Sequence, residues 1–188
     1  VRDLLCKNIS GIQKIKRHSF TANSNIGLGG FREGFYAMGH PVTNSVKCIP
    51  TMQRADGEVD LVMASGHLHR CYQSGSAKLF LPKTYSPSSE AVFINTAGGL
   101  AEGDAFTLRL QASDQTHLTV TTQAAERVYG AIGSRAAHLN IDITIANSAS
   151  LHWLPQETIL FDNGRLARNL LVQMDQSSSF LASEITVF

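Results

Sequence analysis

The chain has 188 residues, of which 43% are hydrophobic and only 16% are charged, and its formal net charge is +1. This length suits one domain with a hydrophobic core, and no apolar run is long enough to predict a transmembrane helix. The N-terminus lacks the continuous apolar stretch of a secretory signal, and Cys6, Cys48 and Cys71 show no disulfide-framework spacing. Both features favour a cytoplasmic protein.

The charge is divided unevenly along the chain. Residues 1–51 carry 7 Lys and Arg against 2 Asp and Glu, whereas residues 52–188 carry 9 against 13. Binding to nucleic acid requires clustered cations that displace counterions from the phosphates. The acidic composition of the larger part therefore argues against a nucleic-acid-binding protein.

Residues 1–51 differ from the rest of the chain. They contain a glycine-rich stretch at 27–34 and a basic cluster at 14–18, and no apolar–polar alternation lasts more than a few residues. We predict that most of this segment is disordered. Two origins stay open: a translated leader ahead of a natural start at Met52, or a basic transit-type or regulatory arm.

Strand patterns begin after Met52. Val59, Leu61 and Met63 recur at every second position, which predicts a half-buried strand. Residues 77–81 predict another strand, which Pro82 ends because proline donates no N–H to a sheet.

Three soft metal ligands lie two residues apart in the segment between these strands. His67, His69 and Cys71 would share one face of a strand. Imidazole and thiolate both suit nickel, zinc or copper, so these residues are an alternative metal set. The simpler interpretation is a strand whose His and Cys side chains pack or face solvent, since nothing nearby supplies a fourth ligand.

Further strands are expected at residues 91–95, 106–110, 118–121 and 139–145, the last with the clearest alternation. The glycine-rich turn after residue 95 lacks the G-K-[ST] of a phosphate-binding loop, and Asp104 is expected to cap it. Residues 124–131, AAERVYGA, have enough helix propensity to predict a single helical turn.

Residues 151–162, LHWLPQETILFD, contain the single Trp of the chain, Trp153. Pro155 prevents one long strand, so we predict two short strands, 151–154 and 158–161, joined by a corner. Glu157 lies just after that corner. Its carboxylate is either held by local N–H groups or available to a ligand from outside the chain.

A weak repeat joins three segments: SDQTHLTVTTQ (113–123), NSASLHWLPQE (147–157) and DQSSSFLASE (175–184). Leu118, Leu151 and Phe180 stand 33 and 29 residues apart in them. A period of this size built from strand pairs predicts stacked layers. The fold class we expect is therefore all-β with one or two short helices, in a sandwich-like or β-helix-like stack.

Stacked layers would place the polar ends of these strands at similar heights. Gln123, Glu157 and Glu184 end the three repeats, and Glu126 follows closely after the first. We therefore expect acidic and amide groups to gather at one lip of the stack or along an internal passage.

Three stretches carry a resemblance to a known family: NTAGGLAEGD (95–104), TTQAAERVY (121–129) and WLPQETILFD (153–162). They resemble the urease accessory protein family called UreD, or UreH in some organisms. The resemblance covers residues 53 to 188 and leaves out the first 51. Because members of the family continue further, we expect residues 52–188 to be a UreD-like β domain that is truncated at its C-terminus.

The resemblance implies a scaffold without enzymatic activity. Such proteins bind the urease apoprotein and recruit UreF-like and UreG-like partners, and nickel passes transiently to the urease metallocentre without any permanently bound cofactor. We assign the nickel passage to four carboxylates, Asp104, Glu126, Glu157 and Glu184, because carboxylates hold nickel less firmly than Cys and His do. Gln123, Trp153 and Gln156 are assigned to partner binding. Each residue has a structural alternative, such as turn capping or a surface ion pair.

Two other functions stay open. Glu157 and Glu184 could form the acid–base pair of a carbohydrate-active enzyme, although aromatic residues that would stack on sugars make up only 7% of the chain. The set of His67, His69 and Cys71 could instead make a stable nickel- or zinc-binding protein.

Overall fold

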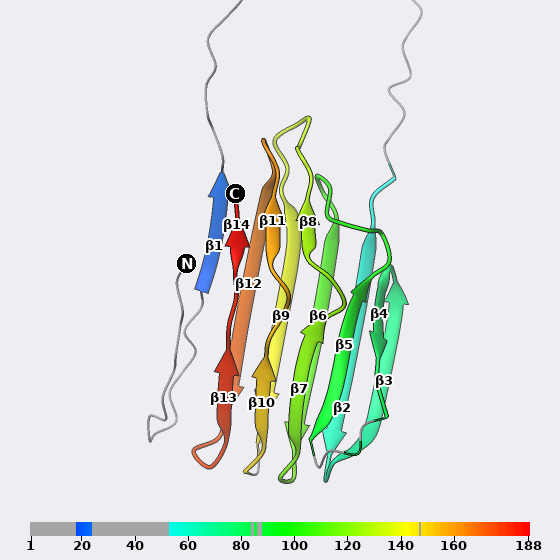
Figure 1. Cartoon of the computed structure of the whole chain (residues 1–188), viewed down its shortest axis with the longest axis vertical. Helices are drawn as coiled ribbons and strands as arrows, with labels where there is room; N and C mark the ends of the chain where they lie inside the picture. The colour runs from blue at the N-terminus through cyan, green and yellow to red at the C-terminus, as the bar shows by residue number, and fades with distance from the viewer. Residues whose placement is uncertain (1–17, 24–52, 84, 86–87, 147) are drawn as a thin grey trace, which may run out of the picture.

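The fold is a stack of short β-strands arranged in two facing layers (Figure 1). The computed structural model describes residues 18–23 as backbone, and residues 53–83, 85, 88–146 and 148–188 in full. Among the described residues all regular structure is β-strand and none is helical. The expected all-β stack is therefore confirmed.

The back layer is one six-stranded sheet, whose strands in spatial order are β1 (His18–Asn23), β12 (Arg165–Met174), β9 (Ala137–Ile145), β6 (Ala105–Ser113), β2 (Asp56–Ala64) and β3 (His67–Gly75). The front layer has two parts. The five-stranded sheet contains β13 (Ser179–Ala182), β10 (Ser150–Trp153), β7 (His117–Thr122), β5 (Ser89–Asn95) and β4 (Ala77–Phe80). The three-stranded sheet contains β14 (Thr186–Val187), β11 (Thr158–Leu160) and β8 (Glu126–Val128).

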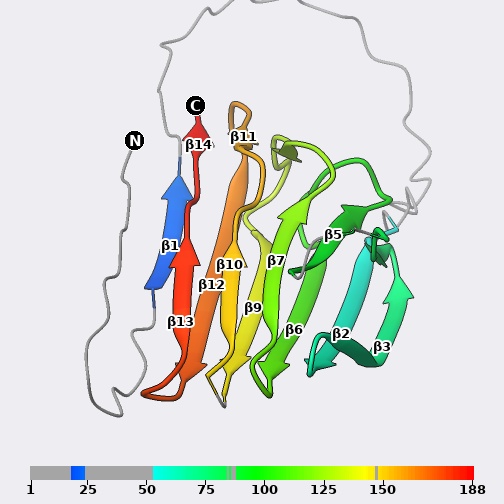
Figure 2. The ribbon, with the colours of Figure 1, turned by 60° about the horizontal axis from the view of Figure 1, so that its bottom comes forward.

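The chain coils through these sheets in a fixed order, as a turned view shows (Figure 2). It runs β7–β8–β9, then β10–β11–β12, then β13–β14, and each strand pairs in parallel with the strand of the preceding turn. Leu151 lies in register with both Leu118 and Phe180. The repeat found in the sequence is thus confirmed as the layer spacing of a β-solenoid.

The core lies between the two layers and is built from rows of side chains in register. Val59, Leu108 and Ile141 form one such row across β2, β6 and β9, and all three are fully buried. In the facing sheet, Val120 and Trp153 are neighbours in another row. Strict alternation along each strand produces these rows, because every second side chain faces the same side of the sheet.

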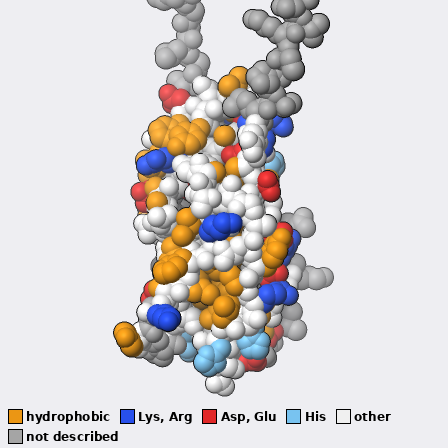
Figure 3. All heavy atoms as spheres, turned by 90° about the vertical axis from the view of Figure 1, so that its right-hand side faces the viewer, with side chains coloured by type: hydrophobic (Ala, Val, Ile, Leu, Met, Phe, Trp, Pro, Cys, Tyr) orange, Lys and Arg blue, Asp and Glu red, His pale blue; other side chains and the backbone are white. Residues whose placement is uncertain are grey.

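The β2–β3 hairpin and the side-chain amide of Gln73 close one end of the stack. Ser65 and Gly66 both have positive φ, 51° and 72°, as a two-residue hairpin turn between β2 and β3 requires. The side chain of Gln73 accepts a hydrogen bond from the N–H of Leu79 (2.9 Å) and donates one to its carbonyl oxygen (3.3 Å). The side chain thereby satisfies backbone groups of β4, which is an edge strand of the five-stranded sheet among the described residues. Figure 3 looks onto this end, where hydrophobic, cationic and His side chains lie next to one another.

The helical turn predicted at residues 124–131 is wrong. Glu126–Val128 form β8, which pairs with β11, and Leu100 adds a parallel bridge to Val128. The neighbouring layers satisfy the backbone groups that a helix would satisfy internally. Tertiary pairing therefore overrides a weak local propensity.

Part of the N-terminal segment forms a strand. Residues 18–23 form β1, which pairs antiparallel with β12 at the edge of the six-stranded sheet. The remainder of residues 1–51, for which we predict disorder, lies outside the described residues.

Candidate functional site

Three corners lie one above another where the five-stranded sheet passes into the three-stranded sheet. They are residues 123–125, 154–157 and 183–185. Backbone hydrogen bonds join them: the N–H of Leu154 donates to the Val120 oxygen (2.8 Å), and the N–H of Ser183 donates to the Trp153 oxygen (3.1 Å). The polar strand ends are therefore stacked at similar heights, as the repeat predicts. We call this feature the corner row.

An arginine interrupts the apolar core beside the corner row. Arg168 lies in register with Leu139, which in turn lies in register with Phe106, so a cation takes a position that is apolar in the two layers before it. Its Nη2 is 2.8 Å from Oε1 of Glu184, and its Nη1 donates to Oγ1 of Thr158 (3.2 Å). The Arg168 side chain is only 12% exposed and that of Glu184 is 33% exposed.

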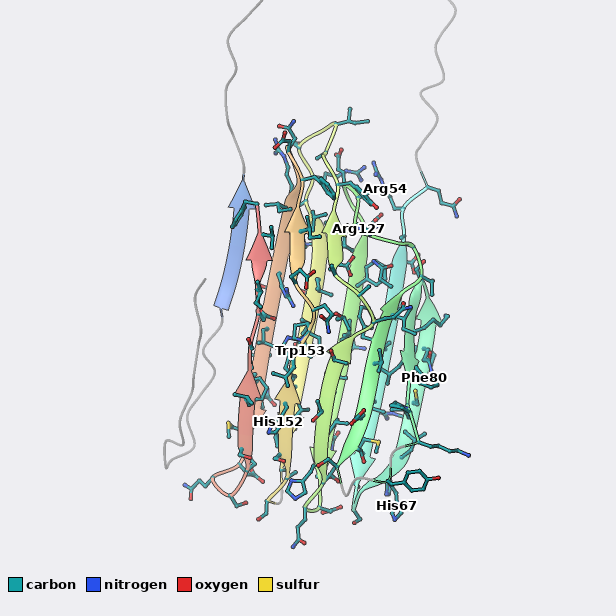
Figure 4. All side chains as sticks on the ribbon, viewed as in Figure 1. Arg54, His67, Phe80, Arg127, His152 and Trp153 are labelled. Carbon is teal, nitrogen blue, oxygen red and sulfur yellow. The ribbon has the colours of Figure 1, made fainter. Side chains whose placement is uncertain are left out.

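Glu184 is also held by the buried tryptophan. Nε1 of Trp153 donates to the same Oε1 of Glu184 at 2.8 Å, and Trp153 is 1% exposed. Figure 4 shows Trp153 at the end of β10, with Arg127 of β8 beyond it. The interpretation of Trp153 as a partner contact is therefore wrong. The indole belongs to the core, and its single polar atom is already paired.

Glu126 lies on the other side of Arg168. Burial raises the pKa of its carboxyl, although a hydrogen bond from Nδ2 of Asn95 (3.1 Å) and the charge of Arg168 oppose the change. Burial likewise lowers the pKa of Arg168, against the attraction of Glu184 and Glu126. Arg168 thus interacts with two carboxylates, and its buried Nε has no hydrogen-bond partner among the described residues.

Glu126 lines two cavities. A small, partly open cavity of about 10 Å³, close to the space of one water molecule, is lined by Trp153, Thr158 and Arg168 as well as Glu126. A surface pocket of about 200 Å³ is lined by Asn95, Gly98, Gly99, Gln123, Glu126 and Arg127, among others. Glu126 therefore contributes to the lining of both the surface pocket and the small cavity beside Arg168.

The other predicted carboxylates lie elsewhere. Asp104 is buried, and its two oxygens accept the backbone N–H groups of Ala55 (2.9 Å) and Ala101 (2.7 Å), so it caps the turn as its structural alternative predicts. The backbone oxygen of Glu157 accepts the N–H of Glu126 (2.9 Å). Its neighbour Thr158 faces the core, so strand alternation places the Glu157 side chain on the outer face. The expected grouping of Glu157 with Glu184 is not found.

Gln123 and Gln156 are exposed in the corner row, at the surface where a partner could contact them. The backbone N–H of Gln156 donates to Oγ1 of Thr122 (2.9 Å), which fixes the corner after Pro155.

The alternative metal set lies at the far end of the stack, on the edge strand β3 (Figure 4). Arg70 pairs with Val62 and Leu68 pairs with Met63, so His69 is the extra residue of a bulge. The bulge breaks the two-residue alternation on which a common face for His67, His69 and Cys71 depends. Across the ranges that the structure describes, no three His, Cys, Asp or Glu side chains are grouped so as to hold a metal ion.

Sequence reasoning missed Arg168 and Asn95. Arg168 occupies an inward position between Leu166 and Leu170. A cation at an apolar position of this alternation could have indicated a buried charge. Asn95 gave no signal, because its contact with Glu126 joins residues 31 positions apart.

Within the described part of the chain, no helix has the length and apolar character needed to cross a membrane.

Comparison with known proteins identifies the family. The family model described as "UreD urease accessory protein" matches residues 55–188. The chain is similar to the urease accessory protein UreD of Rhizobium leguminosarum bv. trifolii, with 44% identity over 136 residues, covering 70% of this chain and 50% of the relative. The UreD of Bradyrhizobium diazoefficiens is 46% identical over 129 residues, covering 69% and 45%.

A third relative gives the same result. The UreD of Rhodopseudomonas palustris strain BisB18 is 41% identical over 152 residues, covering 79% of this chain and 54% of the relative. The chain thus spans about half the length of the curated relatives that it matches. The family match covers well over half of the chain and includes every strand except β1. The chain belongs to the UreD family of urease accessory proteins.

Proposed function

We propose that this protein is a scaffold for urease maturation in the cytoplasm. It binds the urease apoprotein, recruits UreF-like and UreG-like accessory proteins, and assists the transfer of nickel to the urease metallocentre without catalysing a reaction itself. Nickel is cargo here and not a resident cofactor. The family match over residues 55–188 is the observation that carries this proposal.

The corner row supports a role in nickel transfer. Glu126 lines both the surface pocket and the cavity beside Arg168, and Glu184 lies on the far side of that arginine. Carboxylate oxygens bind nickel less firmly than imidazole or thiolate does, which suits a metal that must be released. We assign the first contact with nickel to Glu126, since this residue lines the surface pocket.

The experiment that tests this proposal is co-expression of the chain with urease and its accessory proteins. Nickel per urease active site, urease activity and co-purification of the chain are measured together. Glu126→Gln is expected to lower nickel content several-fold while the chain still co-purifies with urease. Glu58→Gln is the matched control, because Glu58 lies on the outer face of the six-stranded sheet and is paired with Arg109.

Two results would contradict the proposal at different points. Failure of the full chain to co-purify with urease or any accessory protein would reject the scaffold function. Normal nickel content with Glu126→Gln, in a chain that still co-purifies, would reject the role of the corner row alone.

The geometry does not favour the carbohydrate-active alternative. Glu184 is bound by Arg168 and Trp153 inside the stack, while Glu157 lies on the outer face. A glycosidase needs two carboxyl groups flanking one bond.

A further inference from the structure

The outer face of the three-stranded sheet is apolar. Arg127 lies in register with Ile159, and Ile159 with Val187, while Tyr129 and Phe161 follow two residues further along. Tyr129, Phe161, Ile185 and Val187 are between 43% and 49% exposed. We call the outward residues Tyr129, Ile159, Phe161, Ile185 and Val187 the apolar face. The three strands lie side by side in the upper part of the view in Figure 1.

The aromatic part of the apolar face is held rigidly. The rings of Tyr129 and Phe161 are stacked, with centroids 5.7 Å apart and an interplanar angle of 8°. The backbone of Gly99 lies against them: a Cβ at Gly99 would be 2.5 Å from the Tyr129 ring and 2.8 Å from the oxygen of Arg127. Rigid aromatic side chains of this kind are typical anchors of protein interfaces, since little conformational entropy is lost on binding.

The opposite outer face of the molecule has a different character. The six-stranded sheet carries the ion pairs Arg109–Glu58 and Arg70–Asp60 on its outside, and Nδ2 of Asn169 donates to Oδ1 of Asn140 (2.9 Å). Exposed apolar side chains also occur on strands of that sheet, at Leu68, Tyr72 and Met174. The three-stranded sheet differs in presenting a stacked aromatic pair beside aliphatic side chains, and apolar patches of this kind mark interaction sites.

The dimensions of the apolar face fit one α-helix. Three strands about 4.8 Å apart make the face roughly 10 Å wide. Its length runs from the row of Glu157 and Ile185 to Phe161, which is four residues further along, or about 13 Å. A helix with its side chains is also about 10 Å wide, and roughly two and a half turns cover this length.

Two charges border the apolar face and define the polar residues of such a helix. Arg127 is exposed on β8, in the same row as Ile159 and Val187, and has no ion-pair partner among the described residues. Glu157 lies in the neighbouring row, beside Ile185. A complementary helix carries an acidic residue against Arg127 and a basic residue against Glu157, with aliphatic residues between them.

We propose that the apolar face binds a single amphipathic helix of a partner protein. This inference rests on the proposed function only in that the protein works by binding other proteins. It names the surface and the kind of partner element, and it does not depend on nickel transfer.

Site-specific photocrosslinking tests the proposal with the full chain. Benzoylphenylalanine replaces Ile159, and the protein is irradiated with purified urease apoprotein and the UreF-like and UreG-like proteins. The crosslinked partner peptide is identified by mass spectrometry and is expected to lie in an amphipathic helix. The same probe at Thr144, which is exposed on the six-stranded sheet, is the matched control and should give at least 10-fold less product.

Affinity measurements provide an independent readout. Ile159→Asp and Arg127→Glu are each expected to weaken binding of the crosslinked partner at least 10-fold, whereas Arg127→Lys should stay within about 3-fold of the parent. Arg127 is fully at the surface, so its variants also serve where Ile159→Asp does not fold.

Each other outcome overturns the inference. Crosslinks to a second copy of this chain would make the face a self-association surface, and crosslinks to a loop or strand, or none at all, would reject a helical partner. Nickel content is a separate measurement. Helix binding with unchanged nickel content would therefore leave this inference intact while rejecting the role in nickel transfer.

Discussion

Arg168 occupies a position that the two preceding layers fill with Leu139 and Phe106. Its guanidinium pairs with Glu184 and is attracted by Glu126, and its Nε has no hydrogen-bond partner within the described part of the chain. Removing charges from water costs several kcal/mol per ion, so a buried group of this kind stabilises a protein little.

The first prediction concerns Glu126 and pH. Because the pKa of Glu126 is raised in the folded state, the folded protein binds this proton more tightly than the unfolded chain does. Stability contributed by this group is therefore present below the unfolded value of 4.5 and is lost as pH rises through the raised pKa. Glu126→Gln, which cannot ionise, should be more stable than the parent above that range.

The measurement is the melting temperature of both proteins from about pH 4 to about pH 8, and the difference should grow with pH. Glu58→Gln serves as the control, since Glu58 lies on the outer face of the six-stranded sheet, where it pairs with Arg109. A difference in melting temperature that stays constant across this range would show that folding does not raise the pKa of Glu126.

The second prediction concerns the Arg168–Glu184 pair. Arg168→Leu restores the apolar row but leaves Glu184 without its cation, and we expect a loss of about 2–4 kcal/mol in the free energy of unfolding. The double variant Arg168→Leu, Glu184→Gln should regain part of that loss, because Trp153 can still donate to the amide oxygen. Urea unfolding of the parent, both single variants and the double variant measures the coupling. Strictly additive effects would contradict a direct interaction.

At the scale of elements, the ends of the stack depend on close backbone packing. Gly57 of β2 faces β4, and a Cβ there would lie 2.5 Å from the Ala77 nitrogen and 2.6 Å from the Ala77 Cβ. Neither of these atoms can move without shifting a strand. The first layer can close only because this position has no side chain.

The third prediction follows from that contact. Gly57→Ala should destabilise the protein by about 3 kcal/mol through overpacking. Gly66→Ala is the control: Gly66 has positive φ, at 72°, but no atom lies within 4 Å of its added Cβ. Only backbone strain of about 1 kcal/mol is expected there. Thermal or urea unfolding compares the two, and equal losses would show that the contact with Ala77 is unimportant.

At the scale of the whole molecule, each layer contacts mainly its neighbours. β6 and β9 have a strand on both sides, whereas in the described part of the chain β3 is an edge strand and β13 pairs with β10 alone. Stability in such stacks is a sum of layer and interface contributions, so the ends open at lower free energy than the middle.

Hydrogen exchange provides the fourth prediction. Amides of β6 and β9 should exchange only through global unfolding, while those of β3 and β13 should exchange at least 10-fold faster through local opening. Exchange is followed by mass spectrometry of the native protein. Uniform protection across all four strands would indicate one cooperative unit and no layer-by-layer opening.

Much of the fold follows from local patterns in the sequence. The alternation of Leu139, Ile141, Ile143 and Ile145 predicts β9, and Pro155 predicts the break between β10 and β11. The spacing of Leu118, Leu151 and Phe180 predicts the layers. These features are readable because strand alternation and proline act within a few residues, and a repeat records the layer spacing directly.

The site depended on contacts between distant residues. Trp153 and Glu184 are 31 positions apart, and Arg168 is 16 positions from Glu184. The register of the layers likewise decides which carboxylates face the core. It directs Glu126 toward the cavity beside Arg168 and Glu157 toward the outer face.

The amino-acid sequence by itself determined an all-β stack, the layer spacing and the family of this protein. The tertiary structure alone decided that residues 126–128 form a strand, that His69 lies in a bulge, and that Arg168 interacts with two carboxylates. The physical reason is the distance along the chain over which each feature acts. Alternation and turn residues act locally, whereas burial, pairing partners and pKa changes depend on which layers meet.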